Sequence, residues 1–133
     1  MASPDVTVVI PTLDEVQTIE SVLSGLARAL DGRTWEAIVV DDGSGDGTPE
    51  LVLGLAARDP RIRLIRREAP PDLAGSLRAG FDAARGERLG TMNADGSHDP
   101  AAWPARLAAL DAGGELAVGT RYAPGGRAGP WPL

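Results

Sequence analysis

Short apolar runs alternate with longer amphipathic segments along most of the chain. Residues 6–10 and 36–40 are mainly apolar and rich in Val and Ile, whereas residues 61–66 alternate in polarity. Continuous apolar runs are typical of strands buried on both faces of a parallel sheet, and alternation is typical of a strand at a sheet edge. We therefore predict strands at these three places, a fourth at residues 88–92 and a fifth at residues 116–118.

The segments between these runs carry helix signals. Apolar side chains recur three and four positions apart in the first of them, which gives a helix one apolar face. Thr48 and Asp99 each stand before a proline, the arrangement of an N-cap residue followed by the first helical residue. We predict helices at residues 15–30, 49–58, 73–85 and 99–110. Regular alternation of strands and helices favours an α/β sandwich, with a mostly parallel sheet and right-handed crossovers.

Length and charge limit the class of protein. The 133 residues, 43% of them hydrophobic, are enough for one domain with a real core. A formal net charge of −6 argues against nucleic-acid binding, because phosphate neutralisation needs clustered cations. We therefore expect neither a second domain nor a nucleic-acid partner.

The choice of side chains excludes several chemistries. All 13 basic residues are Arg, so a Walker lysine, a Schiff-base lysine and the lysine of an aspartyl-phosphate receiver domain are excluded. The sequence has no Cys, which removes disulfides, thiolate nucleophiles and Cys-based zinc sites. His98 is the single histidine, so the chain cannot form a centre with several His ligands.

The two ends of the sequence suggest a location and an extent. The N-terminus lacks a basic stretch followed by an apolar one, and no apolar run approaches the roughly 18 residues of a membrane-spanning helix. We expect a cytoplasmic protein. Residues 119–133 are rich in Gly and Pro and finish on Trp131-Pro132-Leu133 without a capping element. We interpret residues 1–133 as a single domain that is incomplete at its C-terminal end.

An acidic loop follows the second predicted strand. Asp41 and Asp42 stand side by side there, and glycines follow at alternate positions through residue 47. Adjacent carboxylates repel each other unless hydrogen bonds, a cation or a ligand compensate for their charge. Two interpretations stay open: a flexible turn folded around a ligand, with positive φ at the glycines, or an acidic turn in which Asp46 and Thr48 satisfy backbone donors.

Acidic groups also follow the first and fourth predicted strands. Because the carboxyl ends of parallel strands meet at one edge, Glu15, Asp42 and Asp95 are expected within one crevice. Glu15 alone is equally consistent with an acid in the first turn of a helix. Asn93 and Asp95 are two positions apart and project to one side of an extended strand end, where their oxygens suit a hard divalent cation. For His98 we favour hydrogen bonding within its loop over contact with a ligand phosphate.

Arginines follow the fifth predicted strand. Arg121 stands just beyond it, and Arg127 lies in the glycine-rich tail. A guanidinium at the carboxyl edge of a sheet suits bidentate phosphate recognition, and an unpaired surface arginine is the alternative.

Five segments, in order, resemble those of the inverting glycosyltransferases of family 2, and most closely the dolichol-phosphate (polyprenyl-phosphate) mannose synthases. The segments are residues 8–15, 38–48, 73–81, 92–100 and 119–126. The resemblance implies a GT-A fold, the Rossmann-like sandwich of nucleotide-diphospho-sugar transferases. It also implies a nucleotide-sugar donor and a divalent metal, Mg²⁺ or Mn²⁺.

The resemblance assigns roles to individual residues. The implied metal ligands are Asn93, Asp95 and Ser97, and the implied catalytic residues are Asp95 and Arg121. The implied nucleotide-sugar contacts are Pro11, Leu13, Glu15, Val40, Asp42, Asn93, Ala94, Asp95, Ser97 and Arg121.

The implied reaction moves mannose from GDP-mannose to a polyprenyl (dolichyl) phosphate with inversion. The acceptor phosphate is already ionised near neutral pH, so it needs positioning more than a protein base. The lipid acceptor implies a peripheral position at the cytoplasmic membrane face and a membrane-bound partner subunit. The alternatives are a related transferase that uses UDP-glucose and a catalytically impaired nucleotide-sugar-binding fragment.

The chain departs from the family pattern at three places. Asn93 stands where the family has the first metal-site acid, which removes a charge from the cation site. Asp72 stands where the family commonly has Gly, so the loop toward the donor is expected to differ. The family domain also continues beyond a segment like the one ending this chain.

Overall fold

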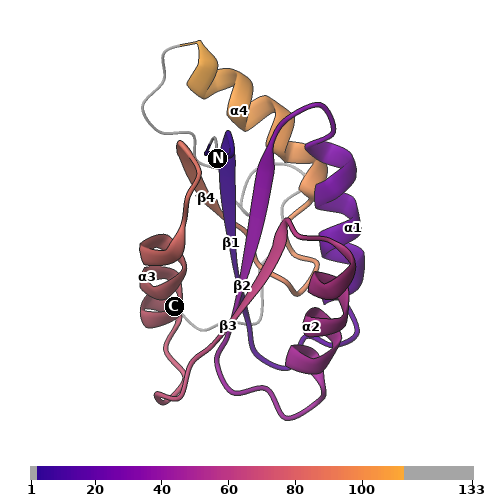
Figure 1. Cartoon of the computed structure of the whole chain (residues 1–133), viewed down its shortest axis with the longest axis vertical. Coiled ribbons are helices and arrows are strands. Elements are labelled where there is room, and N and C mark those ends of the chain that lie inside the picture. Colours follow the sequence, from indigo (N-terminus) through magenta and orange to yellow (C-terminus); the bar gives the residue numbers. More distant parts are fainter. Residues whose placement is uncertain (1–2, 113–133) are drawn as a thin grey trace.

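The computed structural model describes residues 3–112, whose strands form one parallel sheet (Figure 1). The strands are β1 (Val6–Thr12), β2 (Trp35–Asp41), β3 (Ile62–Arg66) and β4 (Arg88–Thr91), and their spatial order is β3-β2-β1-β4. The four strands predicted within these residues are confirmed, and β3 lies at an edge as its alternating pattern indicates. The predicted strand at residues 116–118 lies outside the described residues.

Helices cover both faces of the sheet (Figure 1). On one face lie α1 (Ile19–Ala29), α2 (Thr48–Arg58) and the unit formed by the 3₁₀ helix η1 (Pro100–Ala102) and α4 (Trp103–Asp111). On the other face lies α3 (Leu73–Ala83). Because every residue of β1 and β2 is buried, these strands are apolar almost without interruption.

Two glycines bring elements close to the sheet. A Cβ added to Gly80 of α3 would lie 2.3 Å from Cγ1 of Val9, so this helix rests directly on β1. A Cβ added to Gly90 of β4 would lie 2.1 Å from Cη2 of Trp103, so the indole packs against the strand backbone. Neither contact distance is compatible with a larger residue unless the neighbouring element moves.

The helix boundaries differ from the prediction by one or two residues at several ends, such as that of the helix predicted at residues 73–85, which ends at Ala83, and by more at the start of α1. The predicted helix at residues 15–30 begins only at Ile19, because residues 15–18 form a turn. Thr48 is not an N-cap: that residue is Gly47, with φ of 95°, and Thr48 is the first residue of α2. The Thr48 hydroxyl instead bonds two neighbouring loops, as described below. Asp99 does cap its helix, since its carboxylate accepts from the N–H of Ala101 at 2.9 Å.

Within residues 3–112 we find no helix that is both long and apolar enough to span a membrane.

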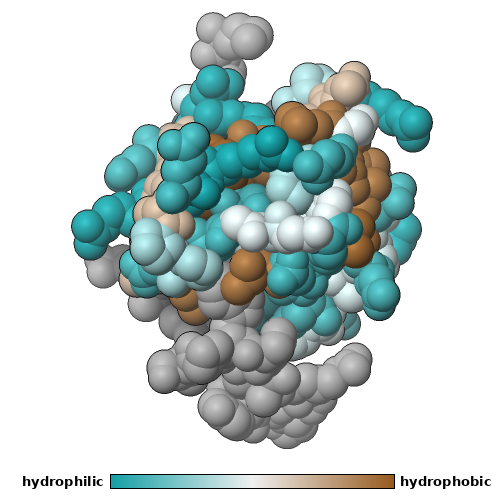
Figure 2. All heavy atoms as spheres, turned by 90° about the horizontal axis from the view of Figure 1, so that it is seen from below, coloured by the Kyte–Doolittle hydropathy of each residue, from teal (hydrophilic) through white to brown (hydrophobic). Residues whose placement is uncertain are grey.

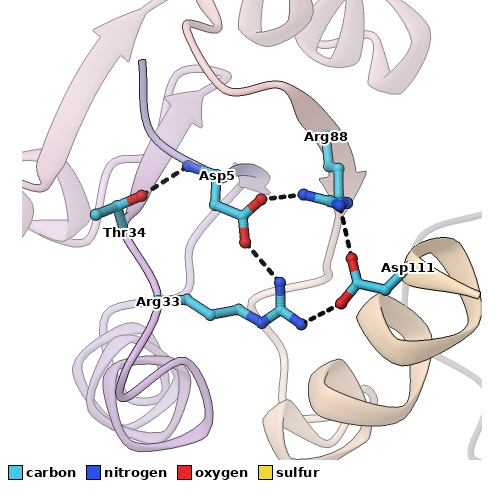
Figure 3. Close-up of polar contacts among 5 residues, drawn as sticks. All are labelled: Asp5, Arg33, Thr34, Arg88 and Asp111. Atoms are coloured by element: carbon cyan, nitrogen blue, oxygen red, sulfur yellow. Dashed lines mark hydrogen bonds and ion pairs between the residues drawn. The ribbon is translucent and has the colours of Figure 1, made fainter. Parts of the chain in front are cut away.

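Four charged residues close a ring at the amino-terminal edge of the sheet (Figure 3). Arg33 bonds Asp5 at 2.5 Å and Asp111 at 2.6 Å, and Arg88 bonds the same two carboxylates. The Asp5 N–H also donates to Oγ1 of Thr34 at 2.9 Å. The ring therefore joins the starts of β1 and β4, the segment before β2 and the end of α4. The hydrogen bond from Arg33 holds the pKa of Asp111 below its ordinary value.

The Asp111→Asn variant is expected to be less stable than the parent chain at pH 7. Because the pKa of Asp111 is lowered in the folded state, its contribution is present above the unfolded pKa of about 3.9 and is lost as pH falls through the folded pKa. Urea unfolding at pH 7 and in acid measures this contribution. Asp82→Asn, which removes the same charge from exposed α3, is the control. A loss of unfolding free energy in Asp111→Asn that is no larger than the loss in Asp82→Asn would contradict this role of Asp111. So would a loss that is as large in acid as at pH 7.

Candidate nucleotide-sugar site

The order in which the chain adds strands to the sheet reverses at β1. From β1 the chain moves to β2 and β3 on one side, whereas β4 lies on the other side. In open parallel sheets, ligands bind in the crevice at the carboxyl ends of the two strands where the order reverses. Here those strands are β1 and β4. Figure 2 looks onto this edge from below the view of Figure 1, and hydrophilic residues cover most of the face.

Pro11 separates β1 from β4 at this edge. The β1–β4 pairing ends at Val9 and Thr91, and the N–H of Met92 then donates to the Val9 carbonyl at 3.0 Å. In a strand between two neighbours, the backbone N–H and C=O groups of successive residues point alternately to one neighbour and to the other. Val9 points toward β4, so Pro11 does too, and the next hydrogen bond to β4 would require the N–H that proline lacks. On the β2 side the pairing continues to Thr12. β1 therefore runs past Pro11, two residues beyond the predicted strand at residues 6–10, but its ladder with β4 ends there.

Glu15 lies just beyond the end of β1 and is 8% exposed. Burial first, and then the charges of Asp95, Asp46 and Asp14, raise the pKa of this carboxyl to about 7. The influence of Asp95 indicates that two of the three acids expected in one crevice, Glu15 and Asp95, are near each other. The alternative role of Glu15 as an acid of the first helical turn is wrong, because α1 begins four residues later at Ile19.

Asp41 is held by hydrogen bonds of its own turn. One carboxylate oxygen accepts from the hydroxyls of Thr12 at 2.8 Å and Ser44 at 2.6 Å. The other oxygen accepts from the N–H groups of Gly43 at 3.0 Å and Ser44 at 2.9 Å. Four donors compensate for the burial of this charge. Asp46 and Thr48 satisfy backbone donors, as the acidic-turn interpretation states, since they accept from the N–H groups of Thr48 and Glu15. The backbone φ is positive at Gly43 and Gly47 but not at Gly45.

Asp42 is 1% exposed and is paired with a cation that the sequence analysis missed. Its carboxylate accepts from the guanidinium of Arg67 and, at 2.7 Å, from the N–H of Asp72. Gly75 makes room for this arginine, since a Cβ there would lie 2.5 Å from Nη2 of Arg67. A buried carboxylate needs either several hydrogen-bond donors or a cation, and this need was the available signal for a partner of Asp42. The bond from residue 72 comes from its backbone, so the glycine common in the family could make it as well.

The loop after β4 carries two buried oxygens without partners. Oδ1 of Asp95 accepts from the N–H of Ser97 at 2.8 Å across a turn in which Gly96 has φ of 86°. Oδ2 of Asp95 and Oγ of Ser97 are buried and have no hydrogen-bond partner within residues 3–112. Buried polar atoms are nearly always satisfied in proteins, so this pair marks a place for a ligand or an ion.

The N–H of Asn93 donates to Nδ1 of His98 at 3.0 Å, which confirms the expected bonding of this histidine within its loop.

The same loop is tied to α1. The hydroxyl of Thr18, the residue before α1, donates to the carbonyl of Ala94 at 2.5 Å. Ala94 is fully buried. The segments that follow β1 and β4 are thus in direct contact.

The oxygen donors of the loop suit a divalent metal. Hard cations such as Mg²⁺ and Mn²⁺ prefer carboxylate, carbonyl and hydroxyl oxygens. The unpartnered atoms of Asp95 and Ser97 are of this kind, and the amide of Asn93 adds a neutral oxygen. The described part of the chain contains no cluster of three or more His, Cys, Asp or Glu side chains placed to hold a metal. A cation here would therefore need oxygens from its ligand as well.

Other residues expected at the site have different surroundings. Val40 is fully buried in the small core beneath α3, with Val9 and Ile38, whereas Leu13 is partly buried in the loop after β1. Arg121 and Arg127 lie outside the described residues.

Replacing Glu15 with Gln is expected to stabilise the chain at pH 8. Because its folded pKa is raised to about 7, the folded state favours the protonated carboxyl, and stability is lost as pH rises from the unfolded value through pH 7. Removing the charge should recover roughly 1–3 kcal/mol at pH 8 and little at pH 4.5. Urea unfolding at the two pH values measures the difference. An equal effect of Glu15→Gln at both pH values would show that the carboxyl is not perturbed.

A parallel sheet covered by helices on both faces, with polar residues where the strand order reverses, defines an open α/β domain of the kind that binds ligands at the carboxyl edge of its sheet. The family model "Glycosyl transferase family 2" matches residues 7–133. The chain is 40% identical over 129 residues to a polyprenol monophosphomannose synthase of Mycolicibacterium smegmatis, covering 94% of this chain and 48% of that protein. It is 36% identical over 128 residues to a dolichol-phosphate mannosyltransferase of Pyrococcus furiosus, covering 96% of this chain and 36% of that protein. The chain belongs to glycosyltransferase family 2.

A solved structure supports the fold assignment. The mannosyltransferase of Pyrobaculum calidifontis in complex with GDP-Man and Mn²⁺ matches with a TM-score of 0.62 and 31% identity, over 71% of this chain and 28% of that protein. The GT-A fold and the family membership expected from the five ordered segments are confirmed. The chain spans less than half the length of the two curated relatives, at 36% and 48%.

Proposed function

We propose that the chain is the donor-binding region of an inverting glycosyltransferase that moves mannose from GDP-mannose to a polyprenyl phosphate. The unpartnered oxygens of Asp95 and Ser97, beside the buried carboxyl of Glu15 at the point where β1 and β4 separate, carry the proposal. The names of the two curated relatives and the GDP-Man in the similar solved structure support the choice of donor and acceptor.

The donor diphosphate is assigned to the loop after β4. Asn93, Asp95 and Ser97 would hold a divalent cation, and Asp95 would provide its only carboxylate among these three. When bound, such a cation neutralises the charge that develops on the departing GDP. The similar solved structure contains Mn²⁺, which supports this type of ion.

The nucleoside is assigned to the edge formed by the ends of β1 and β2. Pro11, Leu13, Glu15, Val40 and Asp42 belong to this part of the proposed site. The two oxygens of Asp42 are already bonded within the chain, so that carboxylate is fixed before the ligand arrives. A preorganised group costs less to order when the ligand binds.

The transfer itself needs few groups from the protein. An oxygen of the ionised polyprenyl phosphate attacks the anomeric carbon of mannose from the side opposite GDP, and the bond to GDP breaks as the new bond forms. Arg121 would contact phosphate during this step. The lipid acceptor places the enzyme at the cytoplasmic face of a membrane, together with the remainder of a longer protein or a membrane-bound partner subunit.

Calorimetry of the full chain with GDP-mannose tests the donor assignment. We expect binding that Mn²⁺ strengthens at least roughly tenfold, and a loss of at least about tenfold in Asp95→Asn, because this variant removes a charged ligand of the proposed cation. Asp82→Asn on exposed α3 is the matched control. Preference for UDP-glucose would assign the other donor considered. Absence of heat with every nucleotide sugar, with or without Mn²⁺, would exclude a donor site in this chain.

A second candidate is a nucleotide-sugar-binding module that has lost catalytic activity, and Asn93 favours it because an amide replaces the first metal-site acid. The Asn93→Asp variant restores that charge and is expected to bind Mn²⁺ more tightly than the parent chain. Mannosyl transfer by an extended chain carrying Asn93→Asp, but not by the extended parent, would identify the native chain as impaired. Transfer by the extended parent itself would reject the second candidate.

A further inference from the structure

Three successive backbone N–H groups after β1 donate to three side chains of the loop after β2. The donors belong to Asp14, Glu15 and Val16, within the turn that precedes α1. They bond Oγ of Ser44 at 2.8 Å, Oγ1 of Thr48 at 3.1 Å and Oδ2 of Asp46 at 3.1 Å, respectively. The three acceptors are every second residue from Ser44 to Thr48, so three successive residues of the first loop are each bonded to the segment after β2.

Asp46 is the centre of this connection. Its Oδ1 accepts from the N–H of Thr48 at 3.0 Å and from the Thr48 hydroxyl at 2.5 Å. Because a hydroxyl has only one proton, the Thr48 oxygen then serves Glu15 as an acceptor. The pKa of Asp46 lies below its ordinary value, mainly because the Thr48 hydroxyl donates to its carboxylate and also because the Val16 N–H does. At neutral pH the carboxylate is therefore charged and can accept all three bonds.

The backbone of the first loop depends on this support. Asp14 has φ of 56°, a left-handed conformation that few residues other than glycine adopt. Its carboxylate accepts from the N–H of Gly45 at 2.9 Å, which adds a bond in the opposite direction. The N–H groups of Glu15 and Val16 flank the Cα of Glu15, so the bonds to Thr48 and Asp46 fix the direction in which the Glu15 side chain leaves the backbone.

We propose that Asp46 and Thr48 are positioning residues of the nucleotide-sugar site, which act by holding Glu15 beside the loop that carries Asp95. The inference rests on the proposed function for its ligand, whereas the contacts that support it are within the chain. Thr48 is fully buried at the start of α2, and its hydroxyl oxygen accepts from the N–H of Glu15 at 3.1 Å. Groups that orient a site residue commonly change affinity by roughly 10–100-fold when they are lost.

A pair of Thr48 variants of the full chain separates positioning from packing. Thr48→Val keeps the shape and removes the hydroxyl, whereas Thr48→Ser keeps the hydroxyl and removes a methyl group. We expect Thr48→Val to accelerate hydrogen exchange of the Glu15 amide and to weaken GDP-mannose binding, each by about tenfold or more. Thr48→Ser should restore both quantities to near the parent values, even where its melting temperature falls as far as that of Thr48→Val.

Asp46→Asn provides a second route if Thr48→Val does not fold. An amide offers one acceptor oxygen in place of two, so we expect faster exchange at the Val16 amide and weaker binding of GDP-mannose. Equal losses in Thr48→Val and Thr48→Ser, or an unchanged Glu15 amide in Thr48→Val, would overturn the proposal. If the parent chain binds no nucleotide sugar, the proposed function fails, and the exchange rates of the Glu15 and Val16 amides alone decide whether these residues position the loop.

Discussion

The missing N–H of Pro11 is the constraint on which the rest of the site depends. The register of β1 directs this position toward β4, so the ladder between the two strands ends there while the pairing with β2 continues to Thr12. The strand order reverses between the same two strands. The missing N–H of Pro11 and the reversal of strand order therefore both act where β1 and β4 separate.

Polar contacts between loops then give the crevice its shape. Asp41 is satisfied within its own turn, Asp42 pairs with Arg67, and Asp46 holds the loop after β1 through Thr48. The buried carboxylates of Asp41 and Asp42 are each matched by several donors, which is the condition for retaining their charge, whereas that of Glu15 is not and has a raised pKa. Asp95 differs because one of its oxygens is buried without a partner among residues 3–112, and this oxygen is the one proposed to face the ligand.

The sequence pattern was sufficient for the four described strands and for the order of the helices, because burial on two faces leaves a continuous apolar run. The convergence of Glu15 and Asp95 followed from the rule for parallel sheets. The roles of Arg67 and Thr48 did not, because they depend on contacts between residues 25 and 33 positions apart in the chain. Thr48 has the local signature of an N-cap, but its hydroxyl is used between loops instead.

The central claim is that the edge where β1 and β4 separate binds a divalent cation with its nucleotide sugar. Paramagnetic broadening by Mn²⁺ in the presence of GDP-mannose tests it most directly, with backbone amide signals of the full chain as the readout. The account predicts that the amides of Asp95, Ser97 and Glu15 broaden first, while those of Arg33 and Asp111 at the opposite edge stay sharp. Broadening centred on the opposite edge, or spread evenly over the chain, would contradict it.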